Sequence, residues 1–85
     1  MSAMSNDDTV RDGFLANVLD QLASGNPPVV RATRDRLVSE GLTDSEATQM
    51  IAIVLRHEMM KMISESRSFD DVLFQSLLEA LPKLP

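Results

Sequence analysis

Apolar residues recur at helical spacing in four segments of the chain, and the longest segment runs from Thr43 to about Ser66. Its apolar positions predict a helix over 44–65 with one core face. These positions are Ala47, Met50, Ile51, Val54, Leu55, Met59, Met62 and Ile63, interrupted only by Glu58. Thr43 and Glu46 stand three residues apart before this run, which is typical of a capping box at a helix start. We expect the other segments to pack around this helix.

Three shorter segments show the same spacing. They predict helices over 9–23, 27–40 and 69–81. Gly25 and Gly41 follow the first two, and a glycine just past the last periodic residue is the usual left-handed stop. Asn26 and Ser68 are the expected N-caps of the second and fourth helices.

The expected fold is all-α: a small four-helix bundle or an orthogonal helix array with a central long third helix. A chain of 85 residues is long enough for one domain. We expect a single helical domain over 9–85 and a disordered N-terminus over 1–8, because residues 1–8 show no periodicity.

The three shorter helices differ in how clearly they define an inward face. The first presents Val10, Phe14, Val18 and Leu22, flanked by Leu15 and Leu19, and the second presents Val30, Thr33 and Leu37. The expected main stripe of the fourth is Phe69, Val72, Leu73, Leu77, Ala80 and Leu81. Phe74 and Leu78 lie off that stripe, which leaves them for a second apolar contact.

The net charge, the absence of cysteine and the length of the apolar runs argue against several classes of protein. The net charge is −5, which opposes unspecific attraction to nucleic acid or to anionic lipid. The chain has no cysteine and therefore no disulfide, thiolate metal site or cysteine nucleophile. No segment approaches the roughly 20 apolar residues of a membrane span. We expect a cytoplasmic protein that does not enter a membrane.

Candidate chemistry is sparse. His57 and Glu58 begin like the zinc-protease motif H-E-x-x-H, but Lys61 stands where the second histidine must be, so we expect no metal site. Glu58 is expected at the rim of the core face, or paired with an arginine or lysine of a neighbouring helix. The methionines of the third helix fit an apolar stripe better than Cu(I) ligation. The chain has no Gly-rich phosphate loop and no nucleophile elbow, so we expect neither an enzyme nor a cofactor.

Basic residues concentrate on the second helix, at Arg31, Arg34 and Arg36. These three are the candidate nucleic-acid contacts, and a DNA-associated or regulatory helical domain is the alternative function. The helix that follows opens with Asp44 and Glu46 and is then apolar, which does not suit a recognition helix in the major groove. We therefore do not expect nucleic-acid binding.

The third helix has apolar residues on a second side as well. Ile53 and Met60 lie a heptad apart there, with His57 between them. Phe74 and Leu78 of the fourth helix are the candidates for covering them within one chain, which is one of two arrangements left open. The other is self-association, and the leading hypothesis is a small interaction module that binds a second copy or another protein. The candidate interface residues are Ile53, His57, Met60, Phe74 and Leu78.

The run GNPPVVRATRDRLVSEGLTDSEATQMIAIVLRHE, followed later by SFDDVLFQSLLEALP, resembles a small group of uncharacterised bacterial proteins. They combine an N-P-P start, a Glu-Gly turn, a Glu-Ala helix opening and a closing Leu-Pro. The resemblance covers about the last two-thirds of the chain. It implies an all-helical fold, and it implies no functional residue.

Overall fold

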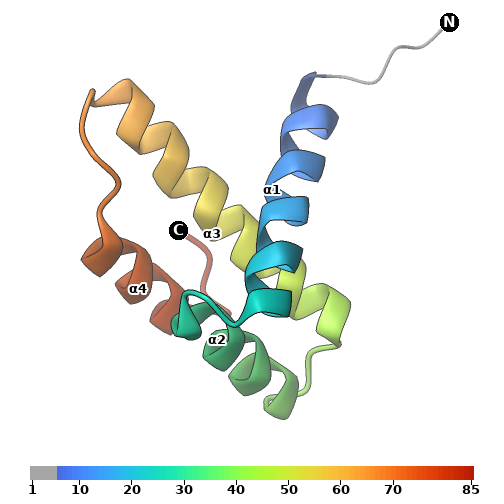
Figure 1. Cartoon of the computed structure of the whole chain (residues 1–85). Coiled ribbons are helices and arrows are strands. Elements are labelled where there is room, and N and C mark those ends of the chain that lie inside the picture. The colour runs from blue at the N-terminus through green and yellow to red at the C-terminus, as the bar shows by residue number, and fades with distance from the viewer. Residues whose placement is uncertain (1–5) are drawn as a thin grey trace, which may run out of the picture.

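The computed structural model describes residues 6–85, with side chains from residue 13 onward. The fold consists of α1 (Asn6–Ser24), α2 (Pro28–Ser39), α3 (Asp44–Ser64) and α4 (Asp71–Ala80), and residues 6–85 contain no strand (Figure 1). α3 packs against each of the other three helices. The expected all-α fold with a central long third helix is confirmed.

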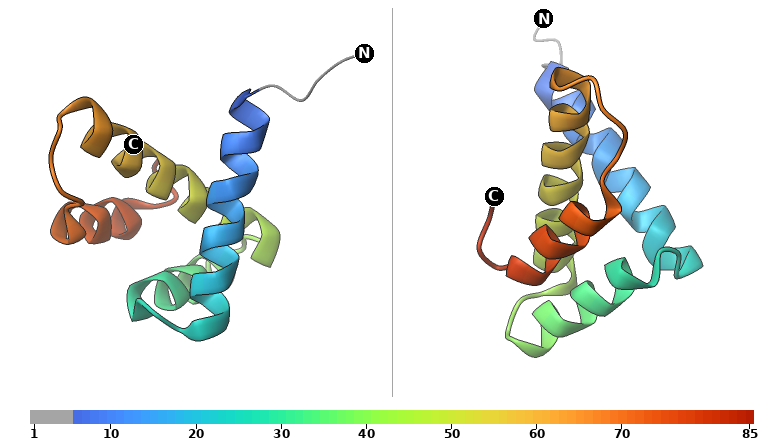
Figure 2. Two further views of the ribbon diagram at one scale, coloured as in Figure 1. Left: turned by 45° about the horizontal axis from the view of Figure 1, so that its top comes forward. Right: turned by 90° about the vertical axis from the view of Figure 1, so that its left-hand side faces the viewer.

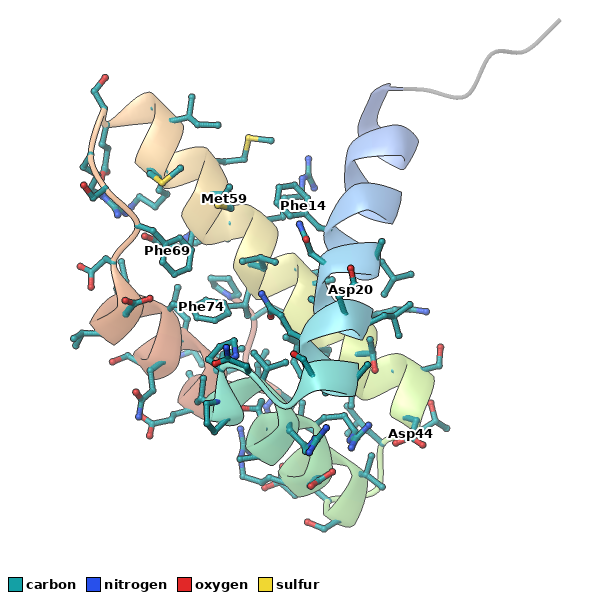
Figure 3. All side chains as sticks on the ribbon, viewed as in Figure 1. Phe14, Asp20, Asp44, Met59, Phe69 and Phe74 are labelled. Atoms are coloured by element: carbon teal, nitrogen blue, oxygen red, sulfur yellow. The ribbon has the colours of Figure 1, made fainter. Side chains whose placement is uncertain are left out.

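The helices cross one another rather than run side by side, as in a helix array (Figure 2). α1 packs against the middle of α3, and the two helices then diverge toward the start of α1 and the end of α3. Phe14 of α1 and Met59 of α3 lie on the facing sides of this pair and are only partly buried (Figure 3). The last turns of α3 are therefore less covered than its first ones.

The predicted N-cap is correct for α3 and incorrect for α2. The capping box of α3 is confirmed: the Glu46 amide donates to Thr43 Oγ1 at 3.0 Å, and the Thr43 amide donates to Glu46 Oε1 at 2.9 Å. The expected Asn26 cap of α2 is wrong, because the N-cap is Pro27. The Asn26 amide instead donates to Gln21 O and so closes the end of α1.

The remaining boundaries differ by a few residues from those expected. α1 begins at Asn6, inside the segment predicted to be disordered, and the prediction for residues 1–5 falls outside the described residues. The expected Ser68 cap of α4 is wrong as well. Asp70 caps α4 by accepting a hydrogen bond from the Leu73 amide at 2.9 Å, and the helix starts two residues later than predicted.

The core is built from all four helices. Its buried apolar residues are Val18, Leu22, Val30, Leu37, Ala47, Ile51, Ala52, Val54, Leu55, Phe74, Leu78 and Leu81. The expected inward residues of α2 are all buried, including Thr33, whose hydroxyl donates to Val29 O at 2.6 Å. On α3 the expected face is buried from Ala47 to Leu55 except at Met50, which is half-buried, but Ile63 at its end is 65% exposed because α1 has diverged from it.

The expected stripe of α4 is confirmed only in part: Leu81 is buried and Phe69 and Leu77 pack against the core. Val72, assigned to the core, is 78% exposed, whereas Phe74 and Leu78, assigned to a second contact, are buried with Leu81. These three residues follow an i, i+4, i+7 pattern and form the side of α4 that faces α2 and α3. The helix is apolar on more than one side, so periodicity alone does not fix its rotation.

Two isoleucines of α3 test the assignment of the core face. Ile51 is fully buried, and we expect Ile51→Ala to lower the free energy of unfolding by about 2–5 kcal/mol through lost burial and a residual cavity. Ile63→Ala removes the same atoms at an exposed position and should change it by less than about 0.5 kcal/mol. Denaturant unfolding measures both, and equal effects of the two substitutions would contradict the assignment.

Candidate functional site

The side of α3 away from the core carries a line of exposed apolar residues. Ile53 is 45% exposed, Met60 43% and Ile63 65%. Their spacing of seven and three residues places them on one side of the helix, and we call these three residues the outer face. The core side of the same helix is fully buried at Ile51 and Val54. The outer face is thus a surface that the described part of the chain leaves partly open.

The structure separates the five candidate interface residues into two groups. Ile53 and Met60 lie on the outer face, and His57 lies between them and is half-buried. Phe74 and Leu78 belong to the core, so their prediction as interface residues is wrong. The arrangement in which they cover Ile53 and Met60 within one chain is also wrong, since both remain exposed. Ile63 was missed because it was assigned to the core face.

The three arginines of α2 have partners within the chain. Arg31 Nη2 donates to Leu22 O at 2.6 Å and to Ala23 O at 3.3 Å, at the end of α1. Arg34 Nε lies 2.7 Å from Asp35 Oδ1. A guanidinium that serves the last carbonyls of a helix satisfies groups that lack a partner within that helix.

Arg36 plays the same role for α4. Its Nη1 donates to Leu81 O at 2.9 Å and its Nη2 to Leu78 O at 3.0 Å, while Glu40 pairs with the same guanidinium at 3.2 Å. A positive charge at a helix C-terminus is favourable because the helix dipole is negative there. Two of the three candidate nucleic-acid contacts are therefore directed at helix ends of their own chain.

The most buried charge of the described residues is the Glu58 carboxylate. The Glu58 side chain is fully buried, and Arg67 binds it with two hydrogen bonds, Nη1 to Oε2 at 2.6 Å and Nη2 to Oε1 at 2.9 Å. The Asp70 amide donates to Oε2 at 3.1 Å. Charge-assisted bidentate pairing of this kind is among the strongest polar contacts in proteins. The sequence predicted an arginine or lysine of a neighbouring helix as one possible partner of Glu58. The partner is an arginine, but it belongs to the α3–α4 connection and not to a helix.

The hydrogen bonds of Arg67 shift the pKa values of the groups that it contacts. The Arg67 hydrogen bonds lower the pKa of Glu58 from 4.5 to about 2, against the opposing effect of burial and with help from the Asp70 amide. The Arg67 side chain also lowers the pKa of Glu65, whose Oε1 lies 2.7 Å from Arg67 Nε. The two carboxylates in turn raise the pKa of Arg67. All three groups are charged at neutral pH, so the cluster is an ion-paired network that ties the α3–α4 connection to α3.

A shallow open depression of about 620 Å³ lies between α2 and α4. Its lining residues are Pro28, Val29, Ala32, Thr33, Arg36, Gln75 and Glu79. Specific small-molecule sites combine an enclosed apolar pocket with a few convergent polar groups. Here the Thr33 hydroxyl and both terminal nitrogens of Arg36 are already hydrogen-bonded within the chain. The Thr33 and Arg36 groups that line the depression are thus already used by the fold itself.

Other site classes also find little support in the described residues. No three or more His, Cys, Asp or Glu side chains of residues 13–85 are arranged to hold a metal ion. Within the described part of the chain, no helix has the length and apolar character that crossing a membrane requires. Comparison with protein-family models, with curated proteins and with solved structures gave no match. The resemblance to the bacterial group stays a prediction.

Two glycines test where the backbone of α1 and its end requires a residue without a side chain. Gly25 has φ +72°, and a Cβ built there would lie 3.0 Å from Arg31 Nη1. We expect Gly25→Ala to lower the free energy of unfolding by about 1–2 kcal/mol, because alanine is strained in this conformation. Gly13 lies inside α1 with nothing within 4 Å of its Cβ position, so Gly13→Ala should raise it by about 0.5–1 kcal/mol. Thermal and denaturant unfolding compare the two, and two changes of the same sign would contradict the prediction.

Acid titration tests the Glu58 ion pair. Folding lowers the pKa of Glu58 from 4.5 to about 2, so its stabilisation is fully present above about pH 4.5 and is lost as the pH falls toward 2. Glu58→Gln removes this titration, and its free energy of unfolding should be lower than that of the wild type at pH 7 and less dependent on pH between 4.5 and 2. Denaturant unfolding at a series of pH values measures both slopes. If the free energy of unfolding of both proteins changes equally with pH between 4.5 and 2, the lowered pKa of Glu58 is contradicted.

Proposed function

We propose that the chain is a small protein-interaction module without enzymatic activity and that the outer face of α3 is its contact surface. The observation that carries the proposal is the line of three large apolar side chains that are 43–65% exposed on one side of a helix whose other side is fully buried at Ile51 and Val54. Single exposed apolar residues are ordinary, but a line of them at helical spacing is typical of a helix contact. The absence of cysteine fits a reducing compartment, and we propose that the module is cytoplasmic.

The occupant we propose is a second copy of the chain. A two-fold axis places the outer face of one copy against that of the other, so that one set of residues covers both. Each side chain is about half exposed, so burying the remainder of all six in the dimer contributes about 4.5–9 kcal/mol in total, at half of the 1.5–3 kcal/mol for a fully buried side chain. The cost of association is at least about 4 kcal/mol, which leaves at most about 5 kcal/mol. This balance corresponds to a weak and reversible dimer with a dissociation constant in the range of about 0.2–1 mM at the upper end of the burial term.

The alternative function, DNA association through α2, has less support. Phosphate binding requires cationic groups directed at solvent. Arg31 and Arg36 instead donate to the carbonyls that end α1 and α4, and Arg34 is paired with Asp35. The net charge of −5 adds a repulsive field.

Charged substitutions on the outer face test self-association. Wild-type protein should show dimer in sedimentation equilibrium when its concentration approaches about 1 mM, and Ile53→Glu with Met60→Glu should remain monomeric, because each dimer would bury four carboxylates. The matched control is Val72→Glu with Leu84→Glu, which places two charges at residues that are 78% and 45% exposed elsewhere. This control should dimerise like the wild type.

Circular dichroism of each variant separates the interface from the fold. A monomeric double variant that retains wild-type helix content supports the proposal. A wild type that is monomeric throughout the concentration range overturns it. Unfolding of the double variant under conditions in which the control stays folded would also overturn it, because Ile53 and Met60 would then be core residues of the single chain.

A further inference from the structure

We draw no further inference here: the strongest candidate, the apolar surface of Phe14, Met59 and Ile63 where α1 and α3 diverge (Figure 3), shares Ile63 with the outer face already proposed as a contact surface, and nothing in the described residues shows what covers the rest of it.

Discussion

The buried carboxylate of Glu58 constrains the second half of the chain. A charge in a protein interior costs several kcal/mol unless a partner and further hydrogen bonds compensate for it, and here the partner lies nine residues onward at Arg67. The chain must therefore turn back after α3, and the same carboxylate then fixes the Asp70 amide. Because Asp70 caps α4, this contact sets both the first residue of α4 and its rotation. Phe74 turns inward and Val72 outward as a result.

The same logic operates at other helix ends. Arg31 serves the carbonyls that end α1, and Arg36 serves those that end α4. Both arginines belong to α2, which contacts α1 and α4 and lies beside α3. α2 thus contributes a narrow apolar stripe to the core. Its arginines donate hydrogen bonds to the last carbonyls of α1 and α4. The cluster of arginines, which in the sequence is compatible with a nucleic-acid surface, is explained in the structure by unsatisfied backbone carbonyls.

Local signals in the sequence were enough to predict the four helices and the central position of the third. Periodicity identifies an apolar face wherever a helix has only one, as on α2, and a capping box fixes the start of α3 at Thr43. The misses have tertiary causes. α4 is apolar on two sides, and the choice between them depends on Arg67, which no local pattern links to Glu58. The only signal in the sequence was the carboxylate itself, since an acid on a core face requires a cation nearby. The exposure of Ile63 depends on where α1 diverges, which is a property of helix packing and not of α3 alone.

The outer face follows from the length of α3. A helix of 21 residues spans roughly 32 Å, and neighbours that cross it cannot cover all of it. The side that remains open is well separated from the side that α4 uses. At about 100° per residue, Glu58 is turned by roughly 140° from Ile53 and by roughly 160° from Met60. A partner on the outer face would therefore leave the contacts between α3 and α4 in place.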